Sequence, residues 1–366
     1  MAKAQRFDLR KNMSKFFVEK YKTLTPYTPG EQPRDMQYVK LNTNESPFPP
    51  PQSVVEAMRQ EATKAQLYSD PTCKAFIDKV SETYGVKPSQ VIATNGSDEV
   101  LNFAFMAFCD KNTPAVFPDI TYGFYSVFAS LHGVPYKTVA LGEDFSIDYR
   151  EYLGVNATVF IANPNAPTGK ALPLNEVEAI VKSNPDNIVV IDEAYVDFGG
   201  ESAVSLVDKY DNLLVCQTFS KSRGLAGARL GIGIGSESVI ADLHTLRYST
   251  NPYNVNRMTL AGGYQALCEK EHYEKTTATI VKNRAYTKAE LEKIGFTVLD
   301  SKANFLFAKT DKVGGEELYL GLKARGVLVR HFNAERIKDY NRITIGTREQ
   351  MDMFLQKTRE ILAEKR

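Results

Sequence analysis

Lys221 is the residue of this sequence whose type and surroundings are most suited to covalent chemistry. It follows a largely apolar run at 212–216 and two hydroxyl side chains, Thr218 and Ser220, and Arg229 comes eight residues later. An amine that forms an imine with an aldehyde must be deprotonated part of the time, which requires desolvation or a cationic neighbour. We expect Arg229 to be that neighbour and, together with Ser220, to bind a phosphate group through its planar guanidinium.

Two other interpretations of this stretch remain open at this point. A surface loop after a strand also commonly carries Lys and Arg. The alternating glycines at 231–235 could instead belong to a dinucleotide-binding loop. This second alternative is weak, because the third glycine of the fingerprint is missing and no acidic residue follows at a convincing strand end about twenty positions later.

Further polar residues come directly after other short apolar runs. Gly96, Ser97 and Asp98 follow the run at 90–94 and precede an apolar helix expected at 100–109. Backbone N–H groups at such a helix start can bind an anion. The alternative is that Ser97 or Asp98 simply caps the helix. Similar runs end shortly before Tyr122, Asn165, Asp192 and Tyr195.

The spacing of these runs predicts the fold. They are short, lack the strict alternation of a one-sided sheet and are interleaved with helical segments such as 174–182. We expect an α/β fold: a large domain at 48–259 with a mostly parallel sheet covered by helices on both faces, and a smaller α+β domain formed by 260–366 with the N-terminal arm 1–47. Ligands of such sheets bind beyond the carboxyl ends of the strands, where all the residues named above are expected.

The composition argues against several classes of function. A chain of 366 residues with 43% hydrophobic residues can bury a large core, and a net charge of +1 gives no basic field for nucleic-acid or membrane binding. The four cysteines and four histidines show no metal-ligand spacing, so we expect no metal site. The N-terminus has no apolar leader and no run is long enough to span a membrane, which predicts a cytoplasmic protein with free thiols.

The residues at the strand ends match the needs of pyridoxal phosphate. This cofactor requires a lysine for its imine, a carboxylate at its ring nitrogen, a partner for its phenolic oxygen, an aromatic ring against its face and donors for its phosphate. The expected groups are, in that order, Lys221, Asp192, Tyr195 with Asn165, Tyr122, and the turn Gly96-Ser97-Asp98 with Ser220 and Arg229. Taken singly, Asp192 would more often lie at a helix cap or turn, and each tyrosine would more often be a core aromatic residue.

The order of these motifs resembles that of the fold type I pyridoxal-phosphate aminotransferases, and within them the histidinol-phosphate aminotransferase family. The resemblance covers nearly the whole chain. Any one segment is a weak signal, whereas all of them in this order are specific for the fold and the cofactor. The segments are Thr25-Pro26-Tyr27, Leu41-Asn42-Thr43-Asn44-Glu45, Asn95-Gly96-Ser97-Asp98-Glu99, Thr121-Tyr122-Gly123, Asn163-Pro164-Asn165-Ala166-Pro167-Thr168-Gly169, Asp192-Glu193-Ala194-Tyr195, Thr218-Phe219-Ser220-Lys221, Ala226-Gly227-Ala228-Arg229 and Arg342-Ile343-Thr344-Ile345-Gly346-Thr347.

The resemblance implies the cofactor contacts given above and adds roles for other residues. It implies a homodimer in which Tyr68 reaches the cofactor phosphate of the neighbouring subunit. It also implies that Tyr27, Arg330 and Arg342, with Asn165, bind the substrate and hold its distal phosphate or carboxylate, which suits the planar fork of the guanidinium group. A sheet-edge cation remains the alternative for Arg330.

The activity that the resemblance implies is transamination of L-histidinol phosphate with 2-oxoglutarate, giving imidazole-acetol phosphate and glutamate in histidine biosynthesis. Transamination of aromatic amino acids and decarboxylation of threonine phosphate are alternatives on the same fold. From another class, a catalytically silent binding or sensor protein is an alternative, although no spare basic region is expected outside the two domains. Two positions depart from the family's usual pattern: Ala166 replaces an asparagine, and His331-Phe332 replaces a polar pair.

Overall fold

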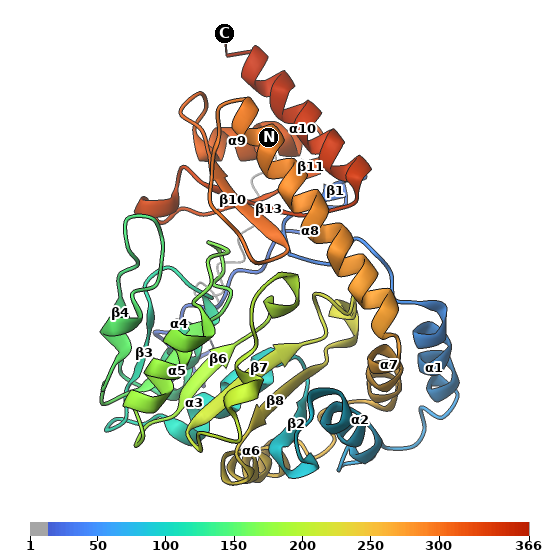
Figure 1. The fold of residues 1–366 in the computed structure, drawn as a ribbon, viewed down its shortest axis with the longest axis vertical. Helices are drawn as coiled ribbons and strands as arrows, with labels where there is room; N and C mark the ends of the chain where they lie inside the picture. Colours follow the sequence, from blue (N-terminus) through green and yellow to red (C-terminus); the bar gives the residue numbers. More distant parts are fainter. Residues whose placement is uncertain (1–13, 366) are drawn as a thin grey trace.

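A seven-stranded, mostly parallel sheet forms the centre of the larger part of the molecule (Figure 1). The computed structural model describes residues 14–365; the chain start at 1–13, to which the expectation of no apolar leader refers, lies outside the described residues. Across the sheet the strands are β2 (Val91–Thr94), β8 (Gly231–Gly235), β7 (Leu213–Thr218), β6 (Val189–Asp192), β5 (Thr158–Ala162), β3 (Ala115–Pro118) and β4 (Tyr136–Val139). In this sheet β8 alone runs antiparallel to its neighbours.

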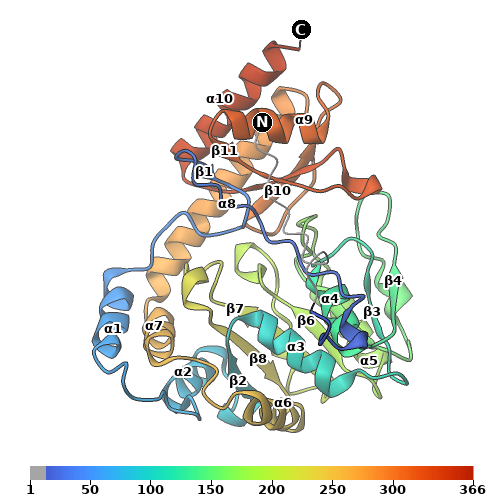
Figure 2. The same cartoon turned by 180° about the vertical axis from the view of Figure 1, so that it is seen from behind.

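Helices cover both faces of this sheet, which confirms the predicted α/β class. One face packs against α2 (Lys74–Tyr84), α5 (Leu174–Ser183) and α7 (Arg257–Cys268), and the other against α3 (Ser97–Phe108), α4 (Phe124–His132) and α6 (Glu237–Thr250). Figure 2 shows α3 lying across the second face. Successive strand residues enter opposite cores, as Phe160 and Ile161 do, so a strand buried on both sides needs no alternation of polar residues.

A second sheet forms a smaller α+β unit. Its antiparallel strands lie in the order β12 (Arg330–His331), β13 (Asn341–Thr344), β10 (Phe305–Lys309) and β9 (Thr297–Val298). They share a separate hydrophobic core with α8 (Lys270–Lys293), α9 (Gly315–Ala324) and α10 (Arg348–Ala363). Figure 1 shows this unit above the large sheet, with α8 running from one to the other.

The N-terminal arm packs on the smaller unit. Its strand β1 (Val39–Lys40) pairs in parallel with β11 (Val327–Leu328), and the next residue, Leu41, lies in the core of the smaller unit. Helix α7, by contrast, packs against α1 (Gln52–Ala62), where a Cβ on Gly262 would lie 2.7 Å from Met58 Cγ. The division into 48–259 and 1–47 with 260–366 stays a prediction.

Three further segments complete the fold. The glycine-rich stretch 231–235 is an interior strand, β8, and not a nucleotide-binding loop. Residues 258–291 form two helices that are separated at Glu269, whose φ of −96° and ψ of 42° are not helical. A 3-10 turn forms at Glu19–Tyr21 in the arm. None of the helices within residues 14–365 is both long and apolar enough to cross a membrane.

Candidate active site

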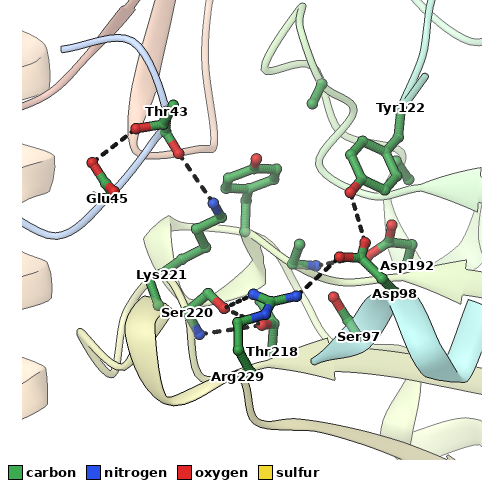
Figure 3. Close-up of a pocket in the computed structure, with 15 residues that line it drawn as sticks. Thr43, Glu45, Ser97, Asp98, Tyr122, Asp192, Thr218, Ser220, Lys221 and Arg229 are labelled. Atoms are coloured by element: carbon green, nitrogen blue, oxygen red, sulfur yellow. Dashed lines mark hydrogen bonds and ion pairs between the residues drawn. The ribbon is translucent and has the colours of Figure 1, made fainter. Parts of the chain in front are cut away.

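The polar strand ends meet in one cavity of about 280 Å³ at the carboxyl-end edge of the large sheet (Figure 3). Strands β3, β5, β6 and β7 are parallel, and β2 shares their direction because both β2 and β7 are antiparallel to β8. Their carboxyl ends therefore lie at the same edge. The predicted residues that line the cavity are Ser97, Asp98, Tyr122, Asp192, Tyr195, Ser220, Lys221 and Arg229.

Lys221 reaches the cavity from the loop after β7. Its Nζ donates to the backbone oxygen of Thr43 at 3.3 Å and lies 5.8 Å from the centre of the Tyr195 ring. Burial, followed by the positive charge of Arg342, lowers the pKa of Lys221 to about 8. Arg229, the neighbour expected from the sequence, has a smaller effect on that pKa than Arg342. The amine can therefore act as a nucleophile and base near neutral pH.

Asp192 is the last residue of β6, and its carboxylate is buried. One oxygen accepts from the Tyr125 hydroxyl at 3.1 Å, and the other accepts from the backbone N–H of Ala194 at 3.2 Å. Burial raises the pKa of Asp192 to about 6, and these two hydrogen bonds oppose that rise. A buried carboxylate facing a cavity is suited to a ligand with a cationic N–H group. The attraction between the two charges then offsets the cost of removing each of them from water.

An anion can bind where α3 begins. Gly96 precedes the helix, and no side chain caps its start, so neither Ser97 nor Asp98 acts as a side-chain cap. The Asp98 carboxylate instead pairs with Arg229 at 3.0 Å, and Arg229 Nη1 lies 3.4 Å from the Ser220 hydroxyl. A helix N-terminus, a hydroxyl and a guanidinium thus lie close together, and this set of donors suits a phosphate group.

Two glycines make room for this anion end. A Cβ on Gly96 would lie 2.4 Å from Nη2 of Arg229, and a Cβ on Gly231 would lie 2.3 Å from the backbone nitrogen of Ser97. Gly96 also has a φ of +77°, which L side chains rarely adopt. The turn at 96–97 can therefore press directly onto the backbone of β8.

Two tyrosines line the cavity on either side. The Tyr122 hydroxyl donates to Asp98 at 2.6 Å, which holds the ring in the cavity wall. Tyr195 packs edge to face on Phe305, with ring centres 5.1 Å apart, and its hydroxyl accepts a hydrogen bond from Nδ2 of Asn44 at 2.9 Å. Asp98 in the cavity wall thus fixes the Tyr122 ring, and Phe305 and Asn44, which do not line the cavity, fix the Tyr195 ring.

Arg330 and Arg342 lie directly opposite each other on β12 and β13. Like charges in this position destabilise a sheet unless an anion or a ring compensates. The Phe332 ring lies 5.7 Å from the guanidinium carbon of Arg330 and 5.8 Å from that of Arg342. Arg330 donates to the backbone oxygen of Thr28 at 3.0 Å, and Arg342 donates to that of Asn42 at 3.0 Å. Nε of Arg342 is buried without a partner among the described residues, which favours an anionic ligand.

Other predicted residues do not line this cavity. Tyr27 stacks on Phe124, with ring centres 4.3 Å apart, near the cavity residue Tyr122. The buried amide of Asn165 donates to the backbone oxygen of residue 120 and to the hydroxyl of residue 168, so both its hydrogens are used within neighbouring loops. Tyr68 is 79% exposed and stacks on Tyr253. Their roles toward cofactor and substrate stay predictions.

Sequence reasoning missed three consecutive arm residues. Thr43 and Glu45 line the cavity, and Asn44 contacts Tyr195. The available signal was a run of polar residues, 42–46, directly before the prolines that follow the arm. Tyr125 was also missed; its spacing of three residues after Tyr122 was the only indication.

The described residues contain no group of three His, Cys, Asp or Glu side chains placed to hold a metal ion. All four cysteines are free thiols: Cys73, Cys109 and Cys216 are buried, and Cys268 is exposed. Burial raises the pKa of Cys216 well above its usual range, so this thiol is inert although it lies near the carboxyl end of β7.

The donor set fits the pyridoxal phosphate predicted from the sequence. An amine with a lowered pKa, a buried carboxylate, a tyrosine hydroxyl and an anion site converge on one cavity. Each matches one functional group of that cofactor. The unpaired N–H of Arg342 beyond them suits an anionic group on a second ligand.

Comparison with known proteins points the same way. Residues 36–357 match the family model described as aminotransferase class I and II. The chain is 46% identical over 352 residues to the histidinol-phosphate aminotransferase of Brachyspira hyodysenteriae, covering 96% of this chain and 99% of the relative. It is 45% identical over 352 residues to that of Clostridium beijerinckii, covering 96% and 98%. The fold matches a crystal structure of histidinol-phosphate aminotransferase from Sinorhizobium meliloti in complex with pyridoxal-5'-phosphate, with a TM-score of 0.88 and 24% identity over 97% and 99% of the two chains.

Proposed function

Because the chain belongs to the class I and II aminotransferase family and, within it, to the histidinol-phosphate aminotransferases, we propose that it transfers the amino group of L-histidinol phosphate to 2-oxoglutarate. The products are imidazole-acetol phosphate and glutamate, in histidine biosynthesis. The observation that carries the proposal is the convergence of Lys221, Asp192 and Arg229 on one cavity.

Pyridoxal phosphate is the cofactor of this reaction, and when bound it supplies an aldehyde that accepts amines and a ring that withdraws electrons from the substrate carbon. Several residues of the cavity would hold it. Lys221 would bind it covalently, Asp192 would keep its ring nitrogen protonated, and Tyr195 would donate to its phenolic oxygen. The Tyr122 ring would pack against it. The phosphate is bound by the turn at 96–98, Ser220 and Arg229.

Lys221 also moves the proton. With the cofactor held in the cavity, the Lys221 Nζ would be the base placed to take the proton from the substrate carbon that bears the amino group. A pKa of about 8 lets the amine accept and release this proton near neutral pH. The Thr43 backbone oxygen, 3.3 Å from Nζ, orients the amine within the cavity.

The facing pair Arg330 and Arg342, with Tyr27, forms the site for the distal anion of the substrate. A phosphate monoester and the distal carboxylate of 2-oxoglutarate both accept hydrogen bonds from planar guanidinium groups. One anion site can therefore serve both substrates in turn, as a ping-pong transamination requires.

A turnover assay on the purified protein with added pyridoxal phosphate tests this proposal. Glutamate formed from histidinol phosphate and 2-oxoglutarate is the expected product. Release of carbon dioxide from threonine phosphate, or faster turnover of phenylalanine and tyrosine, would overturn it in favour of the related activities. Turnover that is unchanged in Lys221→Ala would favour a silent binding protein.

The proposal includes a homodimer in which Tyr68 completes the anion end of the other subunit's cavity. Support comes from its position: Tyr68 is 79% exposed and stacks on Tyr253, which is itself 41% exposed. Leu67 and Tyr248 add exposed apolar surface close by, where the Tyr248 hydroxyl donates to the backbone of Pro71. A contiguous exposed apolar surface of this kind is typical of a protein interface. The free thiols agree with a cytoplasmic location.

A further inference from the structure

Asn44 joins the arm, the small sheet and Tyr195, and none of the roles above uses it. Its side chain is 1% exposed, and its φ of +56° lies in the left-handed region that Asn and Asp tolerate best. Its backbone N–H donates to the Thr344 hydroxyl at 3.0 Å, and its Oδ1 accepts from the same hydroxyl at 2.9 Å. Its backbone oxygen accepts from Asn304 at 3.0 Å, and its Nδ2 lies 2.9 Å from the Tyr195 hydroxyl oxygen.

The chemistry of the donors fixes the direction of each of these bonds. A backbone N–H can only donate, so the Thr344 oxygen accepts from Asn44 and the hydroxyl hydrogen of Thr344 is left to point at Oδ1. The other polar atom of the Asn44 amide is then Nδ2, which can only donate a hydrogen bond. The Tyr195 oxygen must therefore accept it. With the amide turned round, the Thr344 hydrogen would lose this buried acceptor.

The hydroxyl hydrogen of Tyr195 therefore cannot lie on its bond with Asn44. Tyr195 lines the cavity, so the remaining direction for that hydrogen is toward a ligand. We propose that Asn44 is a positioning residue that turns the Tyr195 proton into the cavity, and that strand β13 fixes this orientation through Thr344. The inference rests on the proposed function, because the acceptor of that proton is the phenolic oxygen of the bound cofactor.

Strand β13 thereby serves both ligands. Arg342, two residues before Thr344, donates to the backbone oxygen of Asn42 at 3.0 Å, so the strand holds the arm on either side of residue 43. A substrate anion that binds Arg342 would contact the same strand, β13, whose Thr344 orients Asn44. The donor to the cofactor and the anion site for the substrate are thus set by one element.

The substitution Asn44→Asp tests the direction of the proton with little change of shape. A carboxylate only accepts, so the Tyr195 hydrogen would turn toward residue 44 and away from the cavity. A donor to the phenolic oxygen stabilises its anion and favours the proton-free lysine linkage, whose visible absorbance changes with pH. We expect the midpoint of that change in the loaded enzyme to move about one pKa unit higher, and kcat/KM to fall about tenfold, because a hydrogen bond to a charged group is lost.

Three further variants show whether Asn44 acts through Tyr195. Tyr195→Phe should raise the midpoint, and Asn44→Asp should add no further shift in that background. Thr344→Val, which keeps the shape but loses both hydrogen bonds to Asn44, should shift it in the same direction, whereas Thr344→Ser should titrate like the unmodified enzyme. Thr344→Val decides the question if Asn44→Asp does not fold.

The inference is overturned by an Asn44→Asp enzyme that titrates like the unmodified one, or by a shift that adds fully to that of Tyr195→Phe. A failure of the proposed function looks different. In that case the unmodified protein develops no pH-dependent visible absorbance when pyridoxal phosphate is added.

Discussion

Asp98 and Arg229 form an ion pair at the anion end of the cavity, with Oδ2 and Nη2 3.0 Å apart. Their side chains are 34% and 45% exposed, so the pair itself contributes little to stability. A phosphate group offers the guanidinium more acceptor oxygens and more charge than the carboxylate does. The ion pair therefore holds the guanidinium in place, and we expect a bound phosphate to displace the carboxylate at little cost.

Replacing Arg229 by Gln should weaken the binding of pyridoxal phosphate by about 10- to 100-fold, because a charge-assisted hydrogen bond is lost. The dissociation constant can be measured by equilibrium dialysis of the cofactor-free protein. Arg229→Lys keeps the charge but loses the planar guanidinium. Its dissociation constant should lie between those of the unmodified protein and Arg229→Gln. Equal affinity for pyridoxal phosphate in all three proteins would show that Arg229 does not bind its phosphate.

Replacing Tyr125 by Phe should make cofactor binding more sensitive to acid. Burial raises the pKa of Asp192 to about 6, and the Tyr125 hydrogen bond lowers it, so its loss raises that pKa further. A protonated Asp192 cannot support a protonated ring nitrogen, so affinity should decline as pH falls through about 6 in the unmodified protein, and at higher pH in Tyr125→Phe. Titrations of cofactor affinity between pH 5 and about 8 measure this midpoint.

Tyr152→Phe is a matched control for this experiment. Tyr152 is also fully buried, and its hydroxyl has no partner among the described residues. Its removal should leave the pH dependence of cofactor binding unchanged. A midpoint that moves equally in both variants would attribute the effect to general loosening of the core.

Replacing Lys221 by Met should stabilise the cofactor-free protein at pH 7 by about 3 kcal/mol. The native pKa of about 8 lies below the unfolded value of about 10.4, so the unfolded state binds more protons between these values. The cost of the buried amine is fully present below pH 8 and disappears as pH rises toward the unfolded value. Urea unfolding of both proteins at pH 7 and about 10 measures the difference, which should shrink with rising pH. A constant difference would show that the pKa of Lys221 is not lowered.

Mixing two inactive variants should restore activity if Tyr68 acts in the other subunit. Lys221→Ala and Tyr68→Ala would each be strongly impaired alone. In a mixed dimer, one cavity combines an intact Lys221 with an intact Tyr68 from the neighbouring chain. Refolding the two variants together should therefore recover up to about a quarter of the activity, and no recovery would argue that Tyr68 acts within its own chain or not at all.

The sequence predicted the parts of the site that belong to strand ends. Asp192 and Lys221 follow short apolar runs, and parallel strands bring such ends to one edge whatever the details of packing. Asn44 and Glu45 escaped this reasoning because they lie in a part of the arm without regular structure, whose path depends on contacts with Thr344 and other distant residues. Such long-range pairings leave no periodic pattern in a single sequence.

The same limit applies to the pKa of Lys221. The sequence placed Arg229 beside it because the two are close along the chain, whereas Arg342, more than a hundred residues away, has the larger effect. Strand β8 escaped for a different reason. Glycine at every second position is unusual inside a strand, although Ile232 and Ile234 between the glycines favour one. The close approach of neighbouring backbone and side chains requires these glycines.

Gly231 leaves the turn at 96–97 room to approach β8, because a Cβ at residue 231 would lie 2.3 Å from the backbone nitrogen of Ser97. A methyl group there would push the turn outward and would move its amides away from a bound phosphate, although residue 231 has no side chain to contact that group. We therefore expect Gly231→Ala to weaken cofactor retention without altering any chemically active side chain.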